Sequence, residues 1–223
     1  MVGASDFFDV PPSDAPPSAD APAVTHSGRS TPIQLSVVTE DQFLILLDRR
    51  EAAMRRRLEQ IISELGQLRD LLVLTNKTNK QAQEPSQDEP SGTPESQETP
   101  AQNRARILLL RSQQAAAQVS KSEGELKGVL SEISMLVAEL INNRIDSNDR
   151  RERLGQKIKI PLEGLLESKW KPFAMQINQL EGTLAKLSTQ ELSAQIDQSV
   201  ANNNDIIAAL NATVSYTHLR AHE

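Results

Sequence analysis

The sequence has no cysteine, and this absence excludes disulfide bonds, thiol catalysis and thiolate metal sites. Aromatic residues make up only 3% of the 223 residues, so there is little bulky material for a thick hydrophobic core. No apolar run approaches the roughly 18 to 20 residues needed to cross a bilayer, and the run from Phe43 to Leu47 ends at Asp48. The N-terminus also lacks the basic and apolar regions of a signal peptide. These absences favour a soluble chain and leave its compartment unknown.

The residues that are present favour helices. Leu, Ile, Ala, Glu, Gln and Arg are plentiful outside the proline-rich stretches, whereas β-branched and aromatic runs are scarce. We therefore predict an all-α fold of long antiparallel helices in a coiled-coil-like bundle. Residues 1–32, rich in Pro, Ala and Asp, predict a disordered leader, and residues 81–101 predict a disordered acidic linker. Alternating apolar residues at 33–38 predict a short isolated strand.

The net charge of −6 lies mainly in these two segments. Residues 1–38 carry −3 and residues 81–103 carry −5, which leaves the predicted helices nearly neutral. Arginines crowd residues 49–57, but acidic residues interleave with them, which favours a solvated helix face over a binding patch. A nucleic-acid surface needs a basic excess on the folded elements, so we do not expect a nucleic-acid partner.

Residues 39–80 predict the first long helix. Thr39 and Gln42 have the spacing of a capping box, in which each side chain satisfies a free backbone N–H group of the other residue. A 4-3 spacing of apolar residues follows and predicts a seam buried against another helix. Glu51 interrupts this seam; we interpret it as a partly exposed position near the bundle end, with a register-setting carboxylate as the alternative. The two seam positions hold Leu44, Glu51, Leu58, Leu65 and Leu72, and Leu47, Met54, Ile61, Leu68 and Thr75.

Residues 102–213 predict a bundle of about three further helices, after the first helix gives out over residues 76–80. The second helix is expected over about residues 102–148, and the third from about Asp149, with an interruption at Ile160–Pro161 and a kink at Pro172. Ser188 or Thr189 is expected to cap the fourth. The predicted seams contain Leu109, Ala116, Val119, Leu126, Leu130, Ile133, Val137 and Leu140, then Leu166, Trp170, Phe173, Ile177, Leu180, Leu184 and Leu187, then Leu192, Ile196, Val200, Ile207 and Leu210.

The sequence offers no recognisable catalytic, cofactor-binding or metal-binding residues. No Ser-His-Asp set, metal-ligand cluster or phosphate-binding glycine loop can be assembled from it. Trp170 and Phe173 are the candidates for a small-ligand pocket between helices, although aromatics at seam positions belong more often to the core. We therefore expect neither an enzyme nor a cofactor.

Residues 214–223, from Val214 to Glu223, read VSYTHLRAHE and resemble the translated transposase-end adapter of a sequencing library. The alternative is a functional His-Tyr-His cluster, since the segment holds Tyr216, His218 and His222. We interpret the segment as adapter read-through and expect the natural chain to continue past about Thr213.

Residues Ile33 to Thr213 resemble the C-terminal helical region of very large, uncharacterised, envelope-associated proteins of planctomycete-type bacteria. The resemblance lies in the run from Ile33 to Leu72, in ELINNRID at 139–146 and in RLGQKIKIPLEGL at 153–165, with the acidic linker between the first two. It implies a fragment of a longer bacterial protein, with an envelope-associated and membrane-anchored parent. It implies no activity, because none is established for the family.

Two functions follow as expectations. The first is a structural or protein-interaction module, a scaffold whose partner is a second copy in a homo-oligomer or another envelope component. The second is a sensory bundle that binds a small ligand near Trp170 and Phe173.

Overall fold

The computed structural model describes residues 39–81, 99–144, 148–184 and 186–217, all within the second of two compact units, residues 39–223. Every regular element in these ranges is helical, which confirms the all-α prediction. The predicted leader, the strand at 33–38 and most of the predicted linker lie outside the described residues. The elements are α1 (Glu40–Lys80), α2 (Pro100–Asn142), α3 (Asn148–Glu152), η1 (Arg153–Lys159), α4 (Ile160–Leu165), η2 (Leu166–Trp170), α5 (Lys171–Thr183) and α6 (Thr189–Ser215).

Capping boxes open the three long helices. Thr39 caps α1 and Ser188 caps α6, as predicted. The start of α2 differs from the prediction: Thr99 forms a capping box with Gln102, and Pro100 occupies the first turn. Proline is tolerated there because the first N–H groups of a helix have no partner within the helix. The linker therefore ends before residue 101, and α2 ends at Asn142 instead of about 148.

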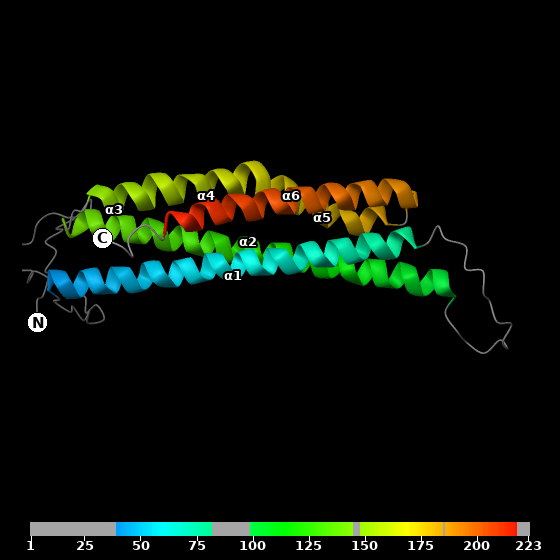
Figure 1. The fold of residues 1–223 in the computed structure, drawn as a ribbon, viewed down its shortest axis with the longest axis horizontal. Coiled ribbons are helices and arrows are strands. Elements are labelled where there is room, and N and C mark those ends of the chain that lie inside the picture. The colour runs from blue at the N-terminus through cyan, green and yellow to red at the C-terminus, as the bar shows by residue number, and fades with distance from the viewer. Residues whose placement is uncertain (1–38, 82–98, 145–147, 185, 218–223) are drawn as a thin grey trace, which may run out of the picture. The chain divides into compact units, whose positions relative to one another are not determined.

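The third helical stretch runs from α3 to α5 without the predicted interruption (Figure 1). Two π-helical segments, η1 and η2, end just before Pro161 and Pro172. In each, a backbone N–H bonds five residues back, from Ile160 to Gly155 and from Lys171 to Leu166. A proline ring collides with the carbonyl four residues earlier in an α-helix, and the wider π turn gives both the ring and the carbonyl room.

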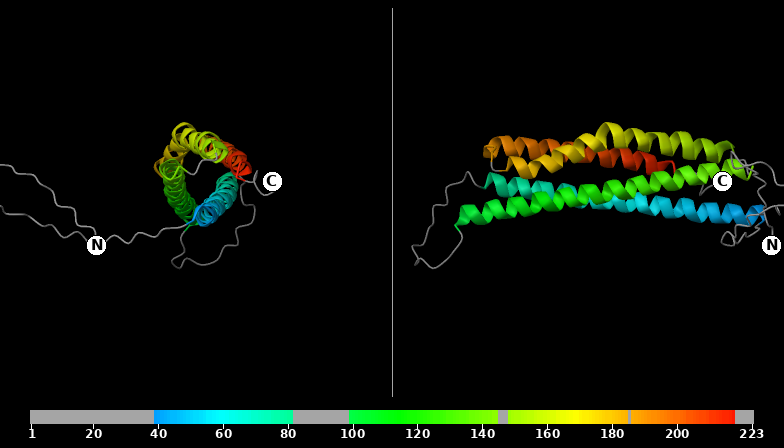
Figure 2. Two further views of the ribbon diagram at one scale, coloured as in Figure 1. Left: turned by 90° about the vertical axis from the view of Figure 1, so that its left-hand side faces the viewer. Right: turned by 180° about the vertical axis from the view of Figure 1, so that it is seen from behind.

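These elements form four antiparallel columns: α1, α2, the run from α3 to α5, and α6 (Figure 2). α1 packs against both α2 and α6. The direction of α2 is opposite to that of α1, because Arg50 bonds Glu139 whereas Thr78 bonds Arg111.

A single core cluster runs through the bundle. In α1 the predicted seam is buried from Leu47 onward, except Glu51. In α2 the prediction is partly wrong: the helix buries Val129 and Leu136, whereas Leu130 and Val137 are only half-buried and Leu109 is exposed. In α6 the buried seam positions include Ser199, Asn203 and Ile206, in place of the predicted Val200 and Ile207. The remaining seam leucines at 166, 184 and 187 are half-buried.

Candidate functional site

The contact between α1 and α6 is polar at one end of the bundle. Asn79 Nδ2 donates to the Thr189 carbonyl oxygen at 2.8 Å and to Ser193 Oγ at 2.9 Å. Asn76 Nδ2 donates to Asp197 Oδ1 at 2.6 Å. Asn76, Asn79 and Ser193 are each at most 7% exposed. We call Asn76, Asn79, Ser193 and Asp197 the polar end cluster; an open hollow lies beside it.

The hollow beside the polar end cluster has a volume of about 470 Å³ and is open to solvent. Lys80 Nζ lies 3.5 Å from Asp197 Oδ2 at its edge, and both side chains are more than half exposed. The exposed Val73 adds an apolar surface. These groups supply hydrogen bonds and fixed charges. The lining residues are Val73, Asn76, Lys77, Lys80, Gln81 and Asp197.

A second polar group lies between α1 and α2, around the carboxylate of Glu64, which is 9% exposed. Lys121 Nζ donates to Oε1 at 2.7 Å, and Gln118 Nε2 donates to Oε2 at 3.0 Å. Gln60 and the buried Ser122 complete this arrangement, which we call the Glu64 cage. Burial raises the pKa of Glu64, but the hydrogen bonds from Lys121 and Gln60 and the charge of Lys121 outweigh it, so the pKa is lowered from its usual value. The cage stabilises an ionised carboxylate inside the bundle.

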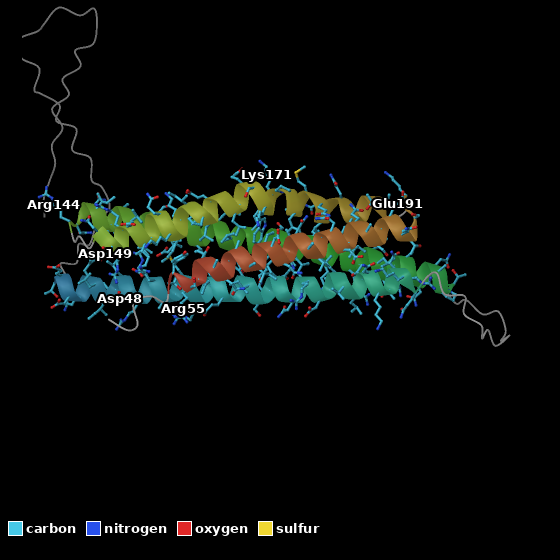
Figure 3. The ribbon with its side chains drawn as sticks, turned by 45° about the horizontal axis from the view of Figure 1, so that its top comes forward. Asp48, Arg55, Arg144, Asp149, Lys171 and Glu191 are labelled. Carbon is cyan, nitrogen blue, oxygen red and sulfur yellow. The ribbon has the colours of Figure 1, made fainter. Side chains whose placement is uncertain are left out.

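A third polar group ties α1 to the start of the third column; Figure 3 shows Asp48 and Asp149 at this end. Arg150 is 3% exposed and bonds Asp48, and its Nε lies 2.9 Å from Glu51 Oε1. Arg153 Nη2 donates to Glu51 Oε2 at 2.6 Å. We call Asp48, Glu51, Arg150 and Arg153 the arginine cluster. The interpretation of Glu51 as a partly exposed position near the bundle end is confirmed: its side chain is 16% exposed, and two arginines from the third column cover and neutralise it.

Trp170 and Phe173, the candidates for a ligand pocket, are both completely buried in the core cluster. Neither lines the hollow at the polar end cluster or the smaller hollow near Glu51. Trp170 Nε1 has no hydrogen-bond partner. The packing of both side chains is that of core residues, and the ligand hypothesis stays a prediction.

The segment interpreted as adapter read-through is only partly described. α6 runs into it as far as Ser215, where Val214 is buried and Tyr216 is 41% exposed. His218 and His222 lie outside the described residues, and the predicted alternative of a His-Tyr-His cluster therefore lies outside them too.

The described residues hold no group of three or more His, Asp or Glu side chains that could bind a metal ion. Of the helices in the described ranges, none is both long enough and apolar enough to span a membrane. Comparison of the chain with family models, with curated protein sequences and with solved structures finds no match in any of the three.

Sequence reasoning missed Asn76 and Asn79, which lie where the first helix was expected to give out, and it missed Asn203 in the last helix. Asn203 is completely buried and donates to the Leu65 carbonyl oxygen at 2.8 Å. A signal was available in α1: Asn79 follows Leu72 by seven residues, so it continues the heptad series. A polar residue in the phase of a leucine seam indicates a specific contact across the interface.

Proposed function

We propose that this chain serves as a structural helical module, a non-catalytic scaffold whose columns form one rigid bundle. The observation that carries the proposal is that the seam of α1, except Glu51, is buried by other helices of the same chain from Leu47 to Asn79. A helix of this length spans roughly 60 Å at 1.5 Å per residue, which suits an elongated scaffold. The polar end cluster, the Glu64 cage and the arginine cluster support the proposal, because each links two columns at one position along their length.

Two measurements on the full chain test this role. Light scattering and circular dichroism over a wide dilution series should give a helical species at the monomer mass of 24.6 kDa throughout. A dimer would move the proposal from a monomeric scaffold to self-association, and loss of helicity on dilution would mean that the fold requires a partner.

The second measurement tests whether the columns keep one arrangement. Because the chain has no cysteine, spin labels attach only to the cysteines that are introduced. Arg56→Cys on α1 and Gln156→Cys on η1 together provide two exposed attachment sites for spin labels, one on each of two columns. A single narrow distance distribution between the labels is expected for a scaffold. A broad or two-peaked distribution would contradict the proposed role, because a rigid scaffold must hold its columns in one arrangement.

The sensory alternative has one observation in its favour, the unpartnered Nε1–H of Trp170. Because Trp170 is the only tryptophan, its fluorescence reports directly on that position. A ligand that binds beside it should shift the emission and strengthen the fold, and a screen without such a shift removes the support for this alternative.

A further inference from the structure

The first turns of α1 expose apolar side chains that the bundle does not cover. Ile45 is 51% exposed and Leu46 is 45% exposed. Met135 of α2 is 48% exposed and lies near the same level of the bundle, because Arg50 bonds Glu132, one turn before it. In the end-on view of Figure 2, α1 forms one corner of the four-column bundle, so the outer side of α1 faces away from the other columns.

Three exposed arginines lie beside this apolar turn of α1. Ile45, Arg49, Ala52 and Arg56 follow a 4-3-4 spacing and therefore form one stripe along the helix, and each of them is exposed. Arg57 is exposed next to Arg56. Within the part of the chain that the structure describes, none of these three arginines has an ion pair or a side-chain hydrogen bond. We call this surface of α1 the outer ridge; its members are Ile45, Leu46, Arg49, Ala52, Ala53, Arg56 and Arg57.

The acidic residues that interleave with these arginines in the sequence bond other partners. Asp48 and Glu51 bond arginines of the third column, as described for the arginine cluster. Glu59 pairs with Arg55, whose Nε lies 2.8 Å from Glu59 Oε1. These three carboxylates therefore leave the arginines of the outer ridge uncompensated.

Two carboxylates of α2 lie near the outer ridge. Glu132 and Glu139 share Arg50 of α1 as their partner, with contacts of 2.7 and 2.5 Å. One cation between two carboxylates leaves a single negative charge, and the three unpaired arginines outweigh it. The surface around the outer ridge therefore keeps an excess of positive charge.

The acidic residues in the first turn of α1 lie on its inner side. Glu40 has the heptad position of the buried Leu47. Asp41 has the heptad position of Asp48, which bonds Arg150 of the third column. The net charge of the whole chain is −6, so the positive excess at the outer ridge is local.

We propose that the outer ridge binds the surface of an anionic lipid bilayer. The interface of such a bilayer accepts exposed apolar side chains, and its phosphate groups attract arginine. Nucleic-acid phosphates would match the arginines but would leave Ile45, Leu46 and Met135 without an apolar environment. Neither of the two hollows described above includes a residue of the outer ridge, and a convex ridge suits a flat partner. This role is additional to the scaffold role and does not depend on it.

The first experiment measures how the full chain partitions onto vesicles by sedimentation. The probe vesicles contain phosphatidylcholine with about a quarter phosphatidylglycerol, and pure phosphatidylcholine vesicles serve as the neutral comparison. The ridge variant carries Arg49→Gln, Arg56→Gln and Arg57→Gln. The matched control loses the same charge at three exposed lysines outside the ridge, with Lys77→Gln, Lys157→Gln and Lys186→Gln. Circular dichroism checks that each variant keeps its helices.

We expect the unmodified chain to bind the anionic vesicles and to be released by added salt. The ridge variant should partition about a hundredfold more weakly, because each arginine near an anionic surface contributes about tenfold. The lysine control should change the partition coefficient by less than about threefold, since charges further than a Debye length from the surface are screened.

A second experiment identifies the surface that touches the bilayer. Leu46→Cys and Met175→Cys each receive an environment-sensitive fluorophore; Met175 is 57% exposed on α5. The label at position 46 should shift its emission to shorter wavelength on anionic vesicles, and the label at position 175 should not. The completely buried Trp170 should keep its emission, which would show that the bundle stays folded on the vesicles.

Four results would overturn the proposal. The first is failure of the unmodified chain to bind the anionic vesicles, and the second is equal binding to neutral ones. An equal loss of binding in the ridge variant and the lysine control would show that only net charge matters. Equal shifts of the two labels would show that the ridge is not the contact surface. Binding to duplex DNA without binding to vesicles would identify the partner as a polyanion and is included in the first of these results.

Discussion

Replacing Glu64 by alanine removes the acceptor on which side chains of two helices converge. The carboxylate is 9% exposed and accepts hydrogen bonds from Gln60 on its own helix and from Gln118, Lys121 and Ser122 on α2. Lys121 is about half exposed and can turn to solvent, whereas the completely buried Ser122 cannot. The variant therefore loses contacts between α1 and α2 and leaves a buried hydroxyl without this acceptor.

The magnitude follows from the individual contacts. A hydrogen bond to a charged group contributes about 1.5 to 3 kcal/mol, and an ion pair with an exposed partner contributes less than about 1 kcal/mol. The Ser122 contact is long, at 3.4 Å, and adds little. We expect Glu64→Ala to lower the free energy of unfolding by about 2 to 3 kcal/mol, and Glu64→Gln, which keeps one acceptor oxygen, by about 1 kcal/mol.

Urea unfolding at pH 7 measures both variants against a matched control on the same helix. Glu59 pairs with Arg55 on the exposed side of α1, and its side chain is 43% exposed. Glu59→Ala should change the free energy of unfolding by less than about 0.5 kcal/mol. A Glu64→Ala midpoint no lower than that of Glu59→Ala would refute the reasoning, because the cage would then contribute no more than a surface pair.

The same carboxylate predicts a pH dependence. Its pKa is lowered in the folded chain, so the unfolded chain binds more protons in the acidic range. The stabilisation is complete above the ordinary pKa of 4.5 and is lost as the pH falls through the lower folded value. The difference in unfolding free energy between the unmodified chain and Glu64→Gln should therefore narrow between pH 7 and pH 3. A constant difference would show that the carboxylate charge is not involved.

Three other changes have effects that can be estimated. Arg150→Ala leaves Glu51 with one cationic partner in place of two and should cost about 3 kcal/mol, seen as faster amide exchange over residues 148–153; unchanged exchange would contradict a buried ion pair. Gly124→Ala should raise stability by about 1 kcal/mol in thermal unfolding, because nothing lies within 4 Å of the added Cβ and alanine favours helix; a loss of stability would indicate a contact at that face. Asn79→Ala removes the bonds to Thr189 and Ser193 and should cost about 1 to 2 kcal/mol in urea unfolding, whereas no change would mean that the polar end cluster does not hold α6.

The sequence predicted the fold best where one signal dominates. The heptad series of α1 is confirmed from Leu47 to Thr75, because leucine at a 4-3 spacing has no better place than a helix interface. In α2 two neighbouring faces of the helix carry apolar residues, and either face could be the buried one. Val129 and Leu136 lie on one face, and Leu130 and Val137 lie on the other. Which phase is buried depends on the position of the neighbouring columns, and the spacing within one helix does not contain that information.

The prediction of an interruption at Pro161 was wrong for a physical reason, which also applies at Pro172. Sequence rules place a break at Pro161 and Pro172 because the α-helical hydrogen bond and the ring cannot coexist. The structure relieves the collision with one π turn before each proline, and the buried residues Ile158 and Trp170 lie within these turns. The surrounding core favours a continuous column more strongly than the prolines favour a break. A tertiary effect of this kind is not visible in the local sequence.

The polar residues inside the seams determine how far one column is shifted along its neighbour. Leucines alone would not determine this. A shift of α2 by seven residues along α1 would place leucines against similar residues, at little cost in apolar burial. A shift in one direction would bring Arg111 to the place of Gln118, so that Glu64 would keep a cation beside it. The opposite shift would bring Gly128 to the place of Lys121 and Glu125 to the place of Gln118, so that Glu64 would lose its cationic partner and face a second carboxylate in a buried position. Burying a carboxylate without such partners costs several kcal/mol, which opposes the shifted alignment. The leucine seams therefore supply most of the stability, and Glu64 opposes one of the two neighbouring registers that the seams would permit.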